Sequence, residues 1–424
     1  MKIPTKINFK FLASHKFQLF FVWLLLNLII LLVVIGYSVT KPVRNEIAFG
    51  VNFSSEDGIN YTLRAFELMG QDKSVSCQNV QNKFNEWAEF EDRPLHKICQ
   101  QLTDSYSQKR ATYIQNQLYG PRLIYPYLIS ITYPLIGINS IVWIPIVIFF
   151  LVLNLQFFLF KGVTKHIFIP AFALLITLSS KHLLELSLST ASTDIIQALL
   201  VMILIVALCT KTPPPILALI TLIVAVLSTF NKQSQVFWLI FAFILYLFSV
   251  KIGRASPEVQ KRLRIVSLLN ILLQPISFLI VENYWNSFSG GKNIGIFPVL
   301  NFDNSTNVLL HYFSILSNVL VNDVATIITK DTSTLLIFSA FFFAFYYFFF
   351  NGHLSQGLDP VLKTFVLVSF AVLLASVGNA IIIGHGNIYL RMYLSFLVLG
   401  FGFILIALTC LLNNIKYKKY LFNQ

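Results

Sequence analysis

The chain has 424 residues, of which 56% are hydrophobic and only 12% are charged. Soluble globular proteins average about 25% charged residues, so this composition excludes an ordinary soluble domain. The net charge of +13 occurs without a nucleic-acid-binding motif, so we expect no nucleic-acid partner and attribute the basic residues to orientation in a membrane.

Long apolar runs recur along the chain, separated by polar segments. A bilayer core about 30 Å thick needs roughly 17–25 apolar residues per helix, and continuous rather than alternating runs favour helices over a barrel. We therefore predict an all-α, polytopic protein in which residues 1–424 form a single integral membrane domain. The ten predicted transmembrane helices lie near residues 17–36, 140–160, 167–180, 194–210, 215–230, 235–250, 265–281, 334–350, 363–383 and 394–412.

The segment 123–138 is ambiguous, because it is apolar but short and carries Pro126 and Pro134. Counting it as a span gives eleven spans and reverses every later helix. With ten spans, the cytoplasmic segments hold 16 Lys and Arg against two acids, and the other side holds 15 against 16. The positive-inside rule therefore favours ten spans, with both termini in the cytoplasm and 123–138 along the outer interface.

This topology predicts a large extracytoplasmic loop, 40–122, which contains amphipathic helices and ten of the eighteen acids. A second extracytoplasmic loop covers 282–333, and shorter outer segments are 181–193, 231–234 and 384–391. Five basic residues fall in a predicted cytoplasmic loop, 251–264. The helix interiors carry almost no charge, which argues against an ion-coupled transporter.

Two carboxylates, Glu56 and Asp57, follow the first helix on the outer side. A carboxylate at the membrane surface can act as a general base toward a sugar or lipid hydroxyl. The alternative is structural, with Asp57 as the N-cap of an interfacial helix.

Arg122 precedes the segment 123–138, and Asp194 enters a later helix from outside. Arg122 is suited to a bound phosphate, although simple snorkelling to the interface would also explain it. For Asp194 the alternative to substrate binding is helix capping together with Thr193.

Lys232 and Arg391 are cations on the outer side, against the positive-inside trend. Arg391, flanked by Tyr389, could bind a phosphate bidentately, or it could be an interfacial anchor. Lys232 could bind the same phosphate, or it could simply extend its ammonium group to the membrane interface. Acids near the start of the chain and lone cations toward its end fit a phosphate-activated sugar carried on a lipid.

The order of these features resembles the C-type (GT-C) superfamily of polytopic glycosyltransferases, which use polyprenyl-phosphate-linked sugars. The acid of that family's first outer loop matches Asp57, with Glu56 beside it. "YGPRLIYPYL" is similar to its Arg-Pro-rich half-helix at Arg122, and "SLSTASTDIIQALL" to its mid-chain acid at Asp194. "LSTFNKQSQVFWL" is similar to its helical hairpin at Lys232, and Arg391 would match its late arginine. Many members carry Asp-Glu where this chain has Glu56-Asp57. Many also carry a soluble C-terminal domain, whereas this sequence has twelve residues after its last predicted helix, so we expect a membrane-only member.

The resemblance implies a transferase that moves the sugar to an extracytoplasmic glycan, lipid or protein acceptor, with Asp57 as general base and Arg391 holding the lipid phosphate. We expect membrane lipid as a further partner, no cofactor and no metal site. The composition favours a bacterial inner membrane. A lipid-linked polysaccharide polymerase or ligase, a glycan flippase or transporter, and a non-catalytic membrane subunit remain the alternatives.

Overall fold

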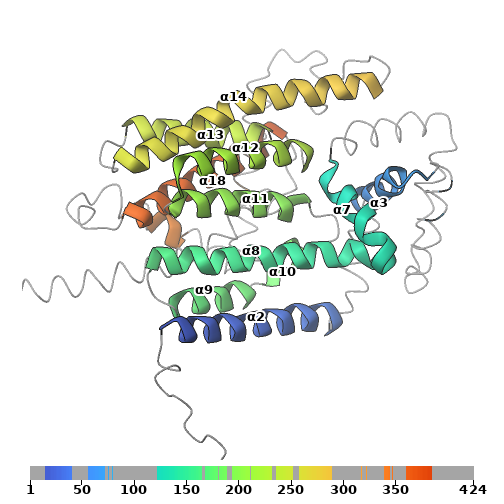
Figure 1. Cartoon of the computed structure of the whole chain (residues 1–424), viewed down its shortest axis with the longest axis horizontal. Coiled ribbons are helices and arrows are strands. Elements are labelled where there is room, and N and C mark those ends of the chain that lie inside the picture. The colour runs from blue at the N-terminus through green and yellow to red at the C-terminus, as the bar shows by residue number, and fades with distance from the viewer. Residues whose placement is uncertain are drawn as a thin grey trace, which may run out of the picture.

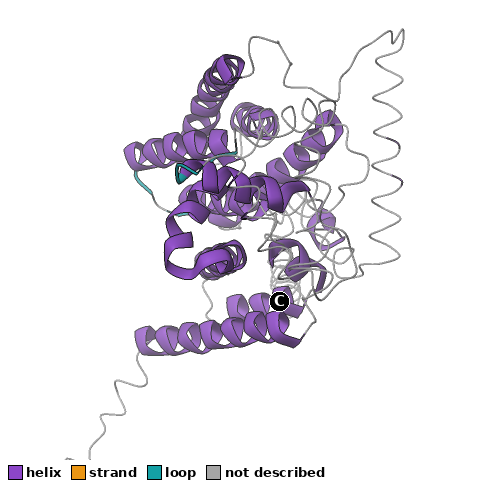
Figure 2. Cartoon of the chain, turned by 90° about the vertical axis from the view of Figure 1, so that its right-hand side faces the viewer, coloured by secondary structure: helices purple, strands orange, loops and turns teal. Residues whose placement is uncertain are grey.

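The computed structural model describes residues 15–40, 56–71, 75, 79, 122–164, 168–179, 181–188, 193–210, 212–231, 235–251, 257–288, 317, 321, 339–343, 346 and 360–383. Within these residues, eleven α-helices and one short 3-10 helix make up the regular secondary structure, and no strand occurs (Figure 2). The predicted all-α fold class is confirmed for this part of the chain.

Eight of the ten predicted transmembrane segments coincide with helices of the described part of the chain. The other two are the eighth, 334–350, and the tenth, 394–412. Of these two, the first is described only at 339–343 and 346, and the second lies outside the described residues. The helices are α2 (His15–Thr40), α3 (Glu56–Leu68), α7 (Ile124–Ile136), η2 (Gly137–Asn139), α8 (Ser140–Thr164), α9 (Phe168–Ser179), α10 (Lys181–Leu188), α11 (Thr193–Cys209), α12 (Pro214–Asn231), α13 (Gln235–Lys251), α14 (Pro257–Phe288) and α18 (Pro360–Ile383).

Among the described residues, three helices are long and apolar enough to cross a membrane: Phe17–Val34 in α2, Trp143–Val163 in α8 and Pro214–Asn231 in α12. These three candidate spans indicate an integral membrane protein. The apolar helices α11 and α13 have 17 residues each. At 1.5 Å per residue they reach about 25 Å, somewhat less than a core of about 30 Å. The ten-span topology therefore stays a prediction.

The long helices lie side by side in one bundle, and α3 and α7 lie together at one end of it (Figure 1). Within the bundle α13 packs most extensively against α14 and α18, α12 against α14, and α11 against α8. Aromatic rings fill the interior. Phe160 of α8 meets Phe365 of α18 edge-on with ring centroids 5.9 Å apart, and Trp238 and Phe241 of α13 meet at 5.7 Å. Such contacts add to the free energy gained from burial.

A sharp corner separates α7 from α8. Pro134 lies near the end of α7, and Gly137 follows with a φ of 61°, a conformation that costs glycine little. The Tyr125 hydroxyl donates to the carbonyl of Ile141 across the corner, at 2.8 Å. With 13 residues, about 20 Å long, α7 is too short to cross the bilayer core by itself.

Helices extend into four of the predicted loops. The predicted cytoplasmic loop 251–264 is helical from Pro257, where α14 begins, and α14 continues to Phe288, inside the predicted loop 282–333. Pro257 at the first helical position and Glu258 in the first turn are helix-start signals. The loop was predicted from its basic residues alone, without these signals. Part of the predicted outer segment 181–193 forms α10, and Asn231 is the buried last residue of α12.

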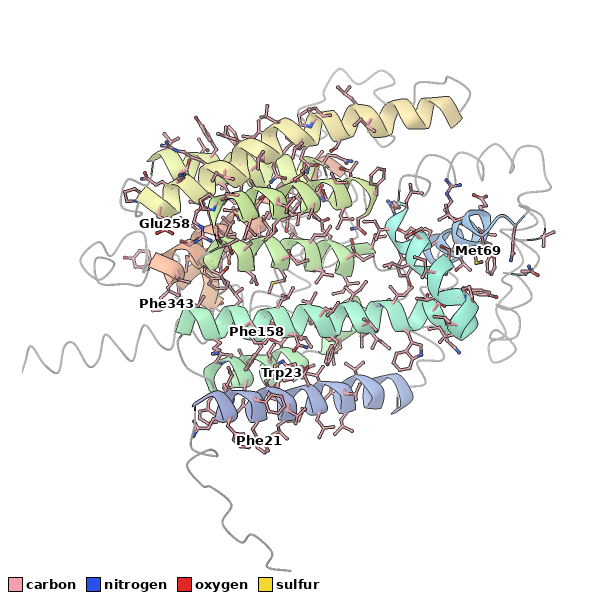
Figure 3. The ribbon with its side chains drawn as sticks, viewed as in Figure 1. Phe21, Trp23, Met69, Phe158, Glu258 and Phe343 are labelled. Atoms are coloured by element: carbon pink, nitrogen blue, oxygen red, sulfur yellow. The ribbon has the colours of Figure 1, made fainter. Side chains whose placement is uncertain are left out.

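Arg262 shows why the basic region of α14 is not a loop. Its side chain is only 8% exposed, and its guanidinium donates to the carbonyls of Ala207, at 2.7 Å, and Thr210. These carbonyls lie at the C-terminus of α11, where the helix dipole favours a cation. Burial lowers the pKa of Arg262, while nearby Glu258 acts in the opposite direction. Figure 3 places Glu258 at the start of α14, at this end of the bundle.

A polar contact holds α2 against α8. The Trp23 indole N–H donates to Oδ1 of Asn154 at 2.7 Å, and the Asn154 amide donates to Oδ1 of Asn27 at 2.9 Å. Figure 3 shows Trp23 on the side of α2 that faces the bundle and Phe21 on the outer side. Phe21 is 55% exposed, as expected for an apolar side chain that faces lipid rather than water.

Candidate functional site

Helix α3 is fixed at the end of the bundle by its apolar face. Tyr61 and Phe66 are buried and meet two tyrosines of α7 edge-on: Tyr61 meets Tyr125 with ring centroids 5.4 Å apart, and Phe66 meets Tyr133 at 4.9 Å. On the more exposed face, Arg64 pairs with Glu67 at 2.7 Å. This amphipathic pattern gives α3 one defined orientation on α7, and it sets the position of Tyr61.

Arg122 reaches Tyr61 from the segment that enters α7. Its Nη1 donates to the Tyr61 hydroxyl oxygen at 2.9 Å. The next residue, Leu123, donates its backbone N–H to the carbonyl of Phe230 at 2.7 Å, which ties this segment to the end of α12. Arg122 is therefore held in place from two sides, by a phenol on α3 and by the backbone of α12.

The N-terminus of α11 completes the arrangement. The Tyr61 hydroxyl lies 3.4 Å from Oγ1 of Thr193, and the Asn231 amide donates to the Thr193 carbonyl at 2.9 Å. Asp194 follows in the first turn and is 5% exposed. We call Tyr61, Arg122, Thr193, Asp194 and Asn231 the Tyr61 cluster. It joins four segments that are far apart in the sequence.

Gln197, beside the cluster, and Asn231, within it, have buried side-chain atoms without a hydrogen bond to any described residue. In Gln197, on α11, both side-chain amide atoms are buried and unbonded, and the side chain is 7% exposed. In Asn231, Oδ1 is buried and unbonded, although the amide nitrogen donates to the Thr193 carbonyl. Buried polar groups are normally bonded, so three such atoms beside one cluster require an explanation.

Burial raises the pKa of Tyr125 well above its usual range, and the nearby Tyr61 adds to the shift. Tyr125 therefore stays protonated and keeps its bond to the Ile141 carbonyl. Its hydroxyl is a structural donor in this site rather than an acid or a base.

The predicted site residues fall into two groups. Arg122 and Asp194 are both in the Tyr61 cluster. Glu56 and Asp57 form the first turn of α3, so Asp57 lies inside the helix rather than at its N-cap, and it stands one turn before Tyr61. The side chains of Glu56 and Asp57 are outside the described residues, as are Lys232, Tyr389 and Arg391.

Sequence reasoning missed Tyr61, Gln197 and Asn231. The signal for Gln197 was a polar residue one turn below Thr193 in an otherwise apolar helix. Asn231 was assigned to a loop, because it adjoins Lys232 in a polar stretch.

The cluster brings together a guanidinium, a phenol, a carboxylate and a helix N-terminus from segments that are far apart in the sequence. A guanidinium and a helix N-terminus can bind a phosphate, and a carboxylate and amides can bind hydroxyl groups. Among the described residues, no group of three or more His, Cys, Asp and Glu side chains could hold a metal ion.

No protein-family model matches the sequence, and neither a curated protein nor a solved structure is significantly similar to it.

Proposed function

We propose that this protein is a glycosyltransferase that moves a sugar from a polyprenyl-phosphate donor to a glycan, lipid or protein acceptor on the extracytoplasmic side. The observation that carries the proposal is the hydrogen-bonded series Arg122–Tyr61–Thr193, whose partners are 61 and 132 positions apart in the sequence. It brings a cation to the N-terminus of α11, next to Asp194 and at the end of the bundle where α3 lies.

In the proposed reaction, Asp57 removes the proton from the acceptor hydroxyl, and the oxygen attacks the anomeric carbon of the sugar. The bond between that carbon and the lipid phosphate oxygen breaks, and the polyprenyl phosphate leaves with the electron pair. Arg122, together with Lys232 and Arg391, would stabilise the charge that develops on the phosphate. Inversion at the anomeric carbon is expected from the resemblance to the GT-C superfamily.

The role of Asp57 rests on its position. It precedes Tyr61 by four residues, so the two positions share a face of α3, and Tyr61 is the residue of that face that contacts Arg122. A base one helical turn from the phosphate-binding arginine fits an acceptor hydroxyl that attacks the sugar carbon next to the phosphate. Asp194, Tyr389 and Glu56 are proposed to help to bind the substrate or to assist the base.

The proposed setting is a bacterial inner membrane, with ten transmembrane helices, both termini in the cytoplasm and the Tyr61 cluster at the extracytoplasmic surface. A lipid-linked donor then enters from the membrane itself. The polyprenyl chain of the donor stays among the apolar helices, and its phosphate reaches the proposed cations, Arg122, Lys232 and Arg391, at the membrane surface.

The test is transfer from a panel of polyprenyl-phosphate sugars by the purified protein in proteoliposomes, with Asp57→Asn against the wild type. Loss of the general base should lower turnover by roughly 10²–10⁴-fold. Glu67→Gln is the matched control on the same helix, because Glu67 pairs with Arg64 on the more exposed face and should retain wild-type turnover. Near-normal turnover of correctly inserted Asp57→Asn would eliminate Asp57 as the base. Movement of the intact lipid-linked sugar between leaflets, without release of polyprenyl phosphate, would instead identify a flippase.

A further inference from the structure

Gln197 lies directly below the Tyr61 cluster. It is four residues after Thr193 on α11, so the two share a face of the helix, and one turn separates them by about 6 Å. Thr193 itself faces Tyr61 and the end of α12, through its hydroxyl and its carbonyl. The face that carries Gln197 is therefore the face on which the cluster is built.

The unbonded state of Gln197 is unusual within the described part of the bundle. The buried amides of Gln156 and Asn270 each donate through the nitrogen, to Thr177 at 3.5 Å and to the Val266 carbonyl at 2.9 Å, although Oε1 of Gln156 has no hydrogen bond to a described residue. In Gln197 neither the oxygen nor the nitrogen is bonded to a described residue, and the side chain is only 7% exposed. A buried polar group without a partner is destabilising, and a leucine at this position would avoid that cost.

We propose that Gln197, together with Oδ1 of Asn231, forms a subsite that binds the hydroxyl groups of the sugar carried by the donor. This inference rests on the proposed function and extends it, because it assigns sugar recognition to residues distinct from those that bind the phosphate. The amide of Gln197 offers an acceptor and two donors, and Asn231 adds a further acceptor. Neighbouring hydroxyl groups of a sugar ring each donate and accept, so they match this set.

The charges near Gln197 favour a neutral ligand over a phosphate. Asp194 lies three residues earlier on α11 and would repel an anion there, whereas a carboxylate accepts hydrogen bonds from hydroxyl groups. The guanidinium of Arg122 donates instead to the Tyr61 hydroxyl, which lies 3.4 Å from Oγ1 of Thr193. The phosphate thus belongs near Arg122 and the sugar about one helical turn deeper, along α11.

The experiment measures binding of two probes to the purified full chain in detergent: polyprenyl phosphate alone and the polyprenyl-phosphate hexose that is the best donor in the transfer assay. The wild type should bind the sugar-carrying lipid more tightly than the bare lipid phosphate. Two or three neutral hydrogen bonds, each contributing about 0.5–1.5 kcal/mol, correspond to a preference of roughly 5-fold or more. In Gln197→Leu this preference should fall at least 5-fold, while the affinity for bare polyprenyl phosphate stays within about 2-fold.

Gln156→Leu is the matched control, because it removes a buried glutamine of α8 whose amide nitrogen donates to Thr177 of α9 and which lies outside the Tyr61 cluster. It should keep the wild-type preference for the sugar-carrying lipid. Gln197→Met serves as a second variant of similar length, so that a folding defect in Gln197→Leu does not decide the result. A purely structural role of Gln197 would lower the thermal stability of the ligand-free variants, whereas we expect it to be unchanged or raised.

Two results overturn the inference, and they are distinguishable. If both Gln197 variants keep the preference for the sugar-carrying lipid, the unbonded amide holds ordered water only, and the proposed glycosyltransferase function is unaffected. If the wild type itself shows no preference and releases no polyprenyl phosphate in the transfer assay, the proposed function fails together with the subsite.

Discussion

The two ends of helix α11 each lie beside an arginine, but the two arginines are used differently. At the C-terminal end, Arg262 of α14 is buried and donates to carbonyls of Ala207 and Thr210, the groups that the end of a helix leaves unbonded. At the N-terminal end, Arg122 donates to a phenol on α3, and Gln197 keeps both amide atoms unbonded to the described residues nearby.

We propose that this difference separates a structural end of the bundle from a binding end. The cation at the C-terminus of α11 completes the hydrogen bonding of the helix and is favoured by the helix dipole. At the N-terminus, the dipole and Arg122 attract negative charge, and the polar atoms that would satisfy Gln197 are not supplied by the described residues. The comparison predicts that substitutions at the two ends change different measured quantities.

The largest effect is expected from Arg122→Ala, which should lower sugar transfer by about 10²–10³-fold, the usual cost of removing one donor to a developing negative charge. The thermal unfolding midpoint should change little, because Arg122 is only partly buried. Transfer assays and thermal unfolding of the same preparation measure both quantities. Arg64→Ala, at a cation of α3 that pairs with Glu67, is the control and should keep wild-type transfer.

A strong loss of stability in Arg122→Ala, with normal transfer by the molecules that remain folded, would contradict the comparison. It would make the N-terminal end of α11 structural like the other end.

At the opposite end, Arg262→Met should reduce the free energy of unfolding by about 2–4 kcal/mol, because charge-assisted hydrogen bonds to two carbonyls are lost. Transfer per folded molecule should stay near the wild-type value, since Arg262 is at the other end of α11 from the cluster. Denaturant unfolding in micelles gives the first quantity, and transfer well below the unfolding temperature gives the second. Lys261→Met, at an exposed neighbour on α14, should leave both unchanged.

The smallest effect is expected away from both arginines, where α18 packs against α13. An added Cβ at Gly378 would come 2.6 Å from Cδ1 of Ile240, the flexible end of that side chain, so Ile240 must shift. Alanine gains about 1 kcal/mol of helix propensity over glycine, which offsets the cost of the shift. Gly378→Ala should therefore change the free energy of unfolding by less than about 1 kcal/mol and leave transfer unchanged. A much larger loss would mean that the contact between α13 and α18 is rigid, and Gly378→Ala combined with Ile240→Ala would then restore stability.

The helices of the bundle were predictable because lipid leaves the backbone few alternatives. The apolar runs at 140–160 and 215–230 correspond to α8 and α12, although each helix extends beyond its apolar part. The start of α14 was not predicted, because an apolar run indicates the part of a helix that suits lipid and not the residue at which the helix begins. The polar residues from Pro257 onward form a helix all the same, and Arg262 there binds carbonyls of another helix.

The site was predictable only in its local signals. Arg122 and Asp194 were recognisable as polar residues at the ends of apolar segments, and their roles in the reaction stay predictions. Tyr61 and Asn231 could not be recognised, because what distinguishes them is contact with Arg122 and Thr193, which are distant in sequence. No periodicity within α3 or α12 encodes those partners.

The polar contact that joins α2 to α8 has a consequence for the order of events during synthesis. Asn27 and Trp23 of α2 find Asn154 only 127 and 131 positions later in the chain. At a ribosomal rate of about 5–20 residues per second, the first helix waits roughly 6–25 s for this partner. The Asn27 amide nitrogen donates to the Trp23 carbonyl within its own helix, whereas Oδ1 of Asn27 accepts from Asn154 only once α8 has been made. Because α2 packs against α9 and is hydrogen-bonded to α8, we expect its rotation about its own axis to be set after its insertion, when these two helices arrive.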